Sequence, residues 1–188
     1  MIEIFDNFFD NNLFQNYLGK FWKDNTWEAE HNKFNYSHAP ERWNYNKSLG
    51  KKTMDDNEVL VENLDSLDQD VLSAITNQIF VITGKKSIPI RYYSNSHTYG
   101  IDGPIHHDDG DVTAIFYPHN TWNPEWEGGT AIYDKSKKQC LSYVTVQPNR
   151  LLLFDASLPH RAMPLTRECY EIRASIVIKN RFIHEKNI

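Results

Sequence analysis

Short β-rich runs separated by turn residues fill the second half of the chain, after Gly84. Six are recognisable: IPIRYYS, VTAIFYP, GTAIYD, LSYVTV, RLLLF and IRASIVI. No helical period lies between them, whereas parallel strands need a crossover connection that is usually a helix. The pattern therefore predicts an antiparallel sandwich, jelly roll or barrel rather than a parallel sheet.

The first half of the chain has a different pattern. Apolar residues recur at helical spacing from Leu13 to Trp22, which predicts an amphipathic helix there. A second helix is predicted from Ser66, with Gly84 placed as a C-cap glycine. Residues 25–60 are polar and aromatic without a sustained period, so we expect a loop that is a candidate lid.

The length of 188 residues and 40% hydrophobic content predict a single domain with an enclosed core. We expect residues 1–87 to form a helical and loop support and residues 88–180 to form the β core. The fold class is thus mainly β with flanking N-terminal helices.

Charge and cysteine content limit the binding partners and the cellular compartment that we expect for this chain. A net charge of −5 disfavours nucleic acid, because a phosphate-binding surface is usually basic. The acidic N-terminus does not resemble a signal peptide, and no run approaches the roughly 18 apolar residues of a membrane span. Only Cys140 and Cys169 are present, too few for a disulfide framework. We expect a cytoplasmic protein in a reducing compartment, which also suits ferrous iron.

The stretch GPIHHDDGD, residues 103–111, offers two His-x-Asp pairs. Residues two apart in an extended chain face the same side, so either pair can present an imidazole and a carboxylate to one metal. Asp109-Gly110 is a turn dipeptide, which favours His106 with Asp108 over His107 with Asp109. Such a pair also arises by chance, and its alternative is a polar strand end in solvent.

Two later residues strengthen the metal interpretation. The segment NRLLLFDASLPHRAMPL is a buried-strand pattern followed by a turn, which brings His160 to the start of a new extended segment. Arg173 lies within EIRASIVI, on the face that it shares with Ser175 and Val177. A guanidinium in mid-strand is either exposed at a sheet edge or held inside by an anion.

These motifs together resemble a known family. The ordered set GxDGPIHHD, WEGGTAIYD, PNRLLLFDASLPHRAMPL and YEIRASIVIK, within residues 88–180, resembles the iron(II)- and 2-oxoglutarate-dependent dioxygenases, in their prolyl-4-hydroxylase-like branch. The resemblance implies a double-stranded β-helix, which is a jelly roll. It also implies that Fe(II) is bound by His106, Asp108 and His160, and that Arg173 holds the distal carboxylate of 2-oxoglutarate.

The implied reaction is hydroxylation of a peptidyl side chain or a small metabolite, with dioxygen consumed and succinate and CO2 released. Ascorbate is a further candidate cofactor. Asp108 favours hydroxylation, because halogenating relatives lack this carboxylate. The chain departs from the collagen-type enzymes at Gly103, where they have tyrosine, and at Arg173, where they use lysine. The common GGET motif after the third strand is Gly128-Gly129-Thr130-Ala131 here, without the glutamate. These departures leave the substrate open.

Several neighbours are candidates for supporting roles. We expect one hydroxyl from Tyr93, Tyr99 or Thr113 to assist Arg173, although core or rim packing is the favoured interpretation for any one of them. Trp122 and Trp126 are predicted either to form a substrate wall or to cap the sheet.

Two further histidines, His107 and His119, are interpreted as spectators. The alternative function is a cupin-like jelly roll that binds a metal or small ligand without oxidative catalysis. Arg173 argues against it, since such a protein needs no anchor for a distal carboxylate. Demethylation of nucleic-acid bases would use the same iron site, but the negative charge disfavours it.

Overall fold

A computed structural model describes residues 1–23, 28–31, 43–48, 64, 66–101 and 103–183, which form two antiparallel sheets and two helices. The larger sheet contains β1 (Ile2–Phe5), β2 (Glu28–His31), β3 (Trp43–Ser48), β4 (Ser87–His97), β5 (Val112–Tyr117), β8 (Arg150–Asp155) and β10 (Arg173–Phe182). The smaller sheet contains β6 (Thr130–Tyr133), β7 (Cys140–Val144) and β9 (His160–Ala162). The helices are α1 (Asn11–Lys23) and α2 (Ser66–Thr83), with a short 3-10 turn at Pro124–Trp126.

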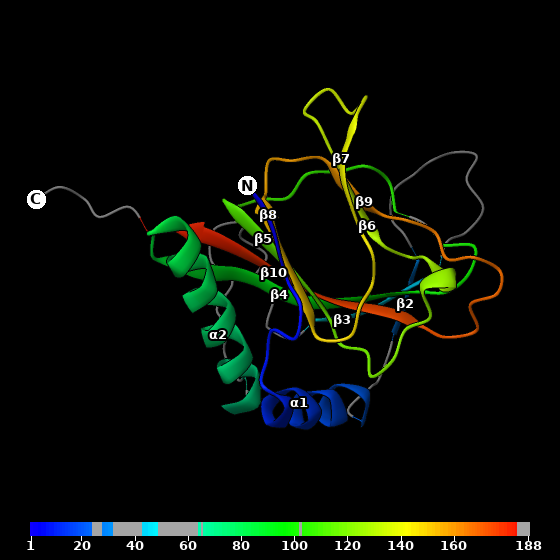
Figure 1. Cartoon of the computed structure of the whole chain (residues 1–188), viewed down its shortest axis with the longest axis horizontal. Coiled ribbons are helices and arrows are strands. Elements are labelled where there is room, and N and C mark those ends of the chain that lie inside the picture. Colours follow the sequence, from blue (N-terminus) through cyan, green and yellow to red (C-terminus); the bar gives the residue numbers. More distant parts are fainter. Residues whose placement is uncertain (24–27, 32–42, 49–63, 65, 102, 184–188) are drawn as a thin grey trace, which may run out of the picture.

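The strand order confirms the predicted jelly roll. The larger sheet runs β1-β8-β5-β10-β4-β3-β2 and the smaller one β7-β6-β9, with the two layers facing each other (Figure 1). β10 lies between β4 and β5, so strands that follow one another in the chain are separated in the sheet. This central position of β10 makes it the strand from which side chains reach the interior between the layers.

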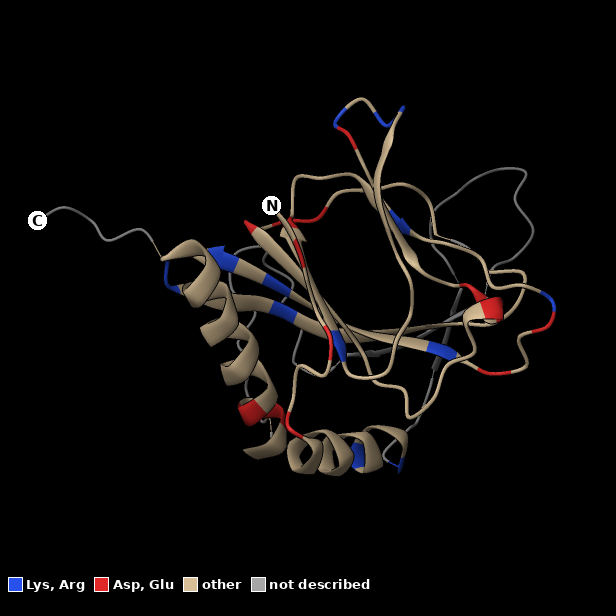
Figure 2. Cartoon of the chain, viewed as in Figure 1, with Lys and Arg blue, Asp and Glu red and all other residues tan. Residues whose placement is uncertain are grey.

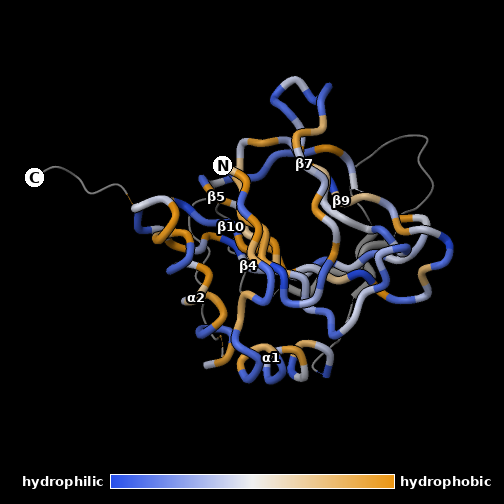
Figure 3. The backbone as a smooth tube through the Cα atoms, in the orientation of Figure 1, coloured by the Kyte–Doolittle hydropathy of each residue, from blue (hydrophilic) through white to orange (hydrophobic). Residues whose placement is uncertain are grey.

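Strand alternation divides the core into two clusters. Ala174, Ile176 and Ile178 of β10 point to one face, where they pack with residues of α1 and α2. Val177 points to the other face, against Ile132 of the smaller sheet. The predicted assignment of Arg173 to the face of Val177 is therefore confirmed. Hydrophobic positions concentrate along the central strands and on part of each helix, while many of the loops are hydrophilic (Figure 3).

Both predicted helices are present. α1 begins after Asp10, whose carboxylate accepts hydrogen bonds from the backbone N–H groups of Asn12 and Leu13 at 2.9 and 3.0 Å. α2 ends at Thr83 and is followed by Gly84, where φ is +68° and the glycine N–H donates to the carbonyl of Phe80. A left-handed residue of this kind ends a helix most readily when it is glycine.

The N-terminal part contributes more strand than the sequence predicts. Residues 25–60 are predicted as loop, yet they contain β2 and β3, and β3 pairs with β4. β1 pairs with β8 at the other end of the sheet. The expectation that residues 1–87 supply only helices and loops is therefore wrong. EAEH and WNYNKS are short and mostly polar, so their strand conformation depends on pairing with a neighbour more than on a local pattern.

Other parts of the 25–60 segment lie outside the described residues, and the candidate lid with them. Within the described part of the chain, neither helix has the length and apolar character needed to cross a membrane.

Candidate metal centre and a buried arginine

Backbone hydrogen bonds bring together the two histidines that lie far apart in the sequence. The N–H of His106 donates to the carbonyl of His160 at 3.0 Å, and the N–H of His160 donates to the carbonyl of His106 at 2.7 Å. The N–H of Asp108 donates to the carbonyl of Ala156 at 3.0 Å. These bonds attach the 103–111 stretch to the segment that enters β9, and they set the positions of all three side chains.

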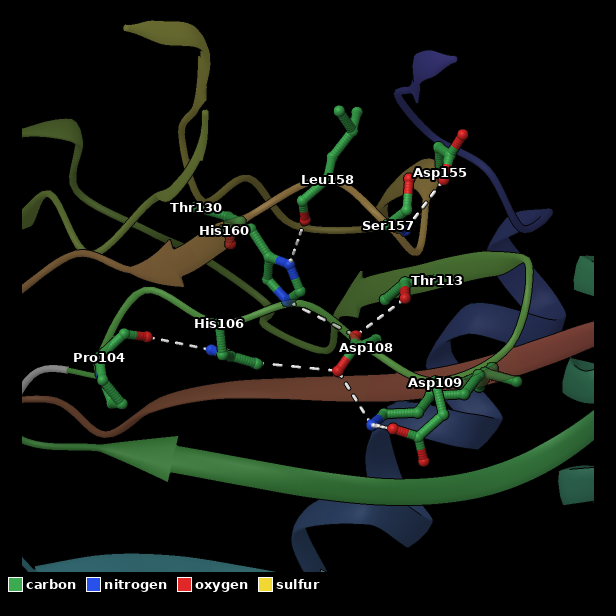
Figure 4. A network of polar contacts seen from close by, with 12 residues as sticks. Pro104, His106, Asp108, Asp109, Thr113, Thr130, Asp155, Ser157, Leu158 and His160 are labelled. Carbon is green, nitrogen blue, oxygen red and sulfur yellow. Dashed lines mark hydrogen bonds and ion pairs between the residues drawn. The ribbon is translucent and has the colours of Figure 1, made fainter. Parts of the chain in front are cut away.

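The three side chains converge on one point. One donor atom from each of His106, Asp108 and His160 lies within 4.8 Å of the others (Figure 4). His106 Nε2 is 3.9 Å from Asp108 Oδ1, and His160 Nε2 is 3.5 Å from Asp108 Oδ2. Asp108 and His160 are buried, whereas about half of the His106 side chain is exposed (48%). The cluster is therefore open to solvent on the side of His106.

Hydrogen bonds on the far side of each ring determine which nitrogen carries the proton. His106 Nδ1 lies 3.0 Å from the carbonyl of Pro104, and His160 Nδ1 lies 3.1 Å from the carbonyl of Leu158. A carbonyl only accepts, so each Nδ1 carries a proton, and in the neutral form of each ring Nε2 has a lone pair toward Asp108. Burial lowers the pKa of His160 to about 4, which keeps its ring neutral near pH 7. Oriented rings of this kind are typical of metal-binding histidines.

Asp108 is the anionic member of the cluster. Thr113 Oγ1 donates to Oδ2 at 2.8 Å, and the ammonium of Lys179 lies 2.9 Å from Oδ1. Burial by itself would raise the pKa of Asp108, but the charge of Lys179 and the hydrogen bonds from Lys179 and Thr113 oppose it, and the pKa is lowered. The carboxyl group is therefore ionised near neutral pH. Two neutral imidazoles and one carboxylate form the donor set that suits non-haem iron(II).

The neighbouring His-x-Asp pair does not join this cluster. His107 is exposed, and the Asp109 side chain is 75% exposed. The stretch is also less regular than predicted, because it pairs through a single bridge instead of a continuous strand. The side chains of His106 and Asp108 nevertheless share one side.

Arg173 is buried, with 2% of its surface exposed. Its Nε donates to the carbonyl of Gly128 at 2.8 Å, while Nη1 and Nη2 donate to the hydroxyls of Ser175 at 3.1 Å and Thr130 at 3.4 Å. Its Cζ lies 5.4 Å from the centroid of the Tyr117 ring. Among the described residues no carboxylate forms an ion pair with it. A buried guanidinium without a counter-ion is costly, so this position suits an anionic ligand.

Arg173 and the metal cluster share the interior of the jelly roll. Lys179, the residue that contacts Asp108, lies on the same face of β10 as Arg173, as the pairing of that strand shows. Thr130, which contacts Arg173, belongs to β6, and β6 pairs with the strand that begins at His160. Figure 2 shows lysine or arginine residues, in blue, on β4 and β10.

The hydroxyl groups around Arg173 differ from those expected. Thr113 contacts Asp108 instead, and Tyr99 is 60% exposed in the turn after β4. Tyr93 lies nearer the metal cluster: burial raises its pKa, and the charge of Asp108 adds to this effect. The hydroxyls that reach Arg173 are those of Ser175 and Thr130. Ser175 was recognisable from the sequence, since it lies two residues along the same strand face.

Two buried histidines flank Arg173. His97 lies directly opposite Arg173 in the β4–β10 pair, and burial together with the Arg173 charge lowers its pKa to about 3. His119 Nε2 lies 2.9 Å from the carbonyl oxygen and 3.1 Å from the backbone nitrogen of Ala174, and burial lowers the pKa of His119 to about 4. Neither belongs to the metal cluster. The burial of His97 is not evident from its polar neighbours in the sequence, because such neighbours do not show which face of a strand is buried.

Trp122 and Trp126 lie in the connection between β5 and β6. Their rings meet edge to face, 5.2 Å apart, and Trp126 packs on Leu165 and Cys169. Trp126 is 9% exposed, so the structure favours the capping interpretation for this residue.

Comparison with known proteins agrees with the family resemblance found in the sequence. The family model of the 2OG-Fe(II) oxygenase superfamily matches residues 91–179. No curated protein matches the sequence. All of the solved structures described next are below 25% identical, so their likeness concerns the fold.

One similar structure is an oxidoreductase of the 2OG-Fe(II) oxygenase family from Burkholderia pseudomallei, with a TM-score of 0.75 and 9% identity over 96% of this chain and 84% of that one. A prolyl hydroxylase from Trichoplax adhaerens, in complex with a peptide fragment of the hypoxia inducible factor oxygen degradation domain, has a TM-score of 0.66 and 16% identity over 96% and 83%. A prolyl-4-hydroxylase from Pseudomonas putida has a TM-score of 0.64 and 14% identity over 98% and 93%.

Proposed function

Because the chain belongs to the 2OG-Fe(II) oxygenase superfamily, we propose that His106, Asp108 and His160 are the ligands of its iron(II). Family membership makes the protein a dioxygenase that uses 2-oxoglutarate and dioxygen. The donor set fits the metal, since each ring presents an unprotonated Nε2 and Asp108 is ionised. When bound, iron(II) couples the decarboxylation of 2-oxoglutarate to the activation of dioxygen.

Arg173 is proposed to bind the distal carboxylate of 2-oxoglutarate. Its planar guanidinium can donate parallel hydrogen bonds to a carboxylate, and Tyr117, Thr130 and Ser175 surround it with an aromatic ring and two hydroxyls. Tyr117 and Thr130 are themselves joined by a hydrogen bond of 2.8 Å. The buried guanidinium without a carboxylate partner among the described residues is the single observation that carries this proposal.

The two histidines and Asp108 contribute to the proposed metal site in different ways. Backbone carbonyls hold the two rings so that each offers one nitrogen, and Asp108 supplies the negative charge that a divalent cation requires. Three ligands from His106, Asp108 and His160 would leave other positions of a bound metal for a chelating 2-oxo acid and dioxygen. Asp108 would be the third ligand, which supports hydroxylation over halogenation.

We further propose a peptidyl side chain as the substrate, with a small metabolite as the alternative. Half of the His106 side chain is exposed, so the cluster faces solvent on one side and a chain can approach it there. The similar prolyl hydroxylase from Trichoplax adhaerens is described with a bound peptide fragment, which supports the same class. β1, β2 and β3 complete the larger sheet, which supports a single domain over residues 1–188.

The test has two stages. First, 2-oxoglutarate is titrated by calorimetry into protein loaded with Mn(II), and binding is expected only when the metal is present. Second, the protein is incubated with iron(II), ascorbate, 2-oxoglutarate and proline-containing peptides, and succinate and the mass gain of one oxygen atom are measured. Omission of ascorbate tests whether it is needed.

Succinate without a modified peptide would direct the search to small metabolites. Bound metal without 2-oxoglutarate binding would contradict the assigned site and favour the cupin-like alternative for these residues.

A further inference from the structure

Lys179 is a buried cation that the functional assignment above leaves without a role. Its side chain is 6% exposed, and its Nζ lies 2.9 Å from Asp108 Oδ1 and 3.8 Å from Asp109 Oδ1. Asp109 is mostly exposed, so the close partner of the ammonium is the proposed metal ligand. A lysine is seldom buried beside a cation site, because the two positive charges repel each other.

Side chains from two neighbouring strands contact the two oxygens of the Asp108 carboxylate. Lys179 in β10 lies opposite Thr113 in β5. Thr113 donates to Oδ2 (Figure 4). Lys179 contacts Oδ1. The carboxylate plane of Asp108 is therefore fixed from both sides, and among the described residues a cationic side chain lies against Oδ1 only.

This asymmetry matters for a metal. A carboxylate can bind a cation through one oxygen or through both. A second bond from Asp108 would occupy a position that the chelating co-substrate and dioxygen need. A metal bound at Oδ1 would also lie close to the ammonium of Lys179, which is electrostatically unfavourable.

On the basis of the proposed function, we propose that Lys179 is a positioning residue that restricts Asp108 to a single bond with the metal, through Oδ2. Lys179 thereby weakens the binding of the metal itself and preserves a position for 2-oxoglutarate. A purely structural lysine would only neutralise the buried carboxylate and stabilise the fold. The two roles predict different binding behaviour in the folded protein.

The decisive variant is Lys179→Met, which keeps an unbranched side chain and removes the charge. Mn(II) is titrated into the metal-free protein, and 2-oxoglutarate is then titrated into the Mn(II)-loaded protein, both by calorimetry. We expect Mn(II) to bind about tenfold tighter or more, because the ammonium no longer repels it. We expect 2-oxoglutarate to bind about tenfold weaker or more, because the second oxygen of Asp108 now competes for a metal position.

Arg181→Met is the matched control, since Arg181 lies on the same strand and is exposed. It removes the same charge and should change neither affinity. Unchanged or weaker Mn(II) binding by a folded Lys179→Met protein would overturn the proposal, and so would unchanged binding of 2-oxoglutarate.

Thermal denaturation of the metal-free protein shows whether the variant folds. Should Lys179→Met fail to fold, Lys179→Gln keeps a donor toward Asp108 without the charge, and the same two shifts are expected. A wild-type protein that binds neither Mn(II) nor 2-oxoglutarate would refute the proposed function. A wild-type protein that binds both, with no shift in the variant, would refute only the role of Lys179.

Discussion

At the scale of single residues, the clearest test separates two neighbouring histidines. His106→Ala should abolish turnover, because it removes an Nε2 that faces Asp108, whereas His107→Ala should retain activity, because that side chain is exposed and outside the cluster. Asp108→Ala and His160→Ala should also be inactive. Succinate release is measured for each variant, with circular dichroism to verify folding. An inactive His107→Ala beside an active His106→Ala would show that the other pair binds the metal.

Arg173 gives a second prediction at this scale. Charge-assisted hydrogen bonds contribute about 1.5–3 kcal/mol each, so Arg173→Ala should weaken 2-oxoglutarate binding about tenfold or more. The 2-oxoglutarate affinity of Arg173→Lys should lie between those of the wild type and Arg173→Ala, since lysine keeps the charge but lacks the planar guanidinium. Calorimetry on the Mn(II)-loaded proteins measures the effect, and the affinity for Mn(II) serves as the control because it should not change. Equal 2-oxoglutarate affinity in all three proteins would exclude Arg173 as the anchor.

At the scale of elements, the turn between the metal cluster and β5 depends on Gly110. Its φ is +88°, and an added Cβ would lie 2.6 Å from the carbonyl oxygen of Asn180. Gly110→Ala should therefore lower the free energy of unfolding by about 1–3 kcal/mol or more, through backbone strain and a clash with β10. Urea unfolding measures the change.

Gly19 provides the matched control for that substitution. It lies inside α1, where an added Cβ would have no neighbouring atom within 4 Å, so Gly19→Ala should raise stability by up to about 1 kcal/mol. A Gly110→Ala protein as stable as the wild type would show that the turn can adjust without cost.

At the scale of the whole molecule, buried histidines should make the fold sensitive to acid. The pKa of His97 is lowered to about 3 and that of His119 to about 4, chiefly by burial. Both rings are neutral in the folded protein, while in the unfolded chain they take up protons below about pH 6.5. Their contribution to stability is therefore present above that pH and declines as the pH falls toward the folded values.

The expected loss between pH 7 and pH 5 is on the order of 2 kcal/mol for each of these histidines. Urea unfolding of the metal-free protein at several pH values measures this loss. His97→Gln should reduce the slope of the free energy of unfolding against pH. His107→Gln is the control, since His107 is exposed and should leave the slope unchanged. A stability that does not vary over this range would contradict the burial of neutral His97 and His119.

Much of the architecture follows from local patterns in the sequence. All six predicted strands are present, because each has enough β-branched, aromatic or aliphatic residues to show a strand pattern by itself. Helical spacing and Gly84 similarly indicated α1 and α2. β1, β2 and β3 were missed, since they are short or polar and become strands only by pairing with another part of the chain.

For the site, the order and spacing of motifs determined which residues to consider: His106, Asp108, His160 and Arg173 were all named from the sequence. Only the tertiary structure decided how they are supported. Lys179 and Thr113 meet Asp108, and Ser175 and Thr130 meet Arg173, through pairings between strands. Sequence periodicity shows which face of a strand a residue occupies, but contacts across strands depend on sheet order and register, which are properties of the folded chain.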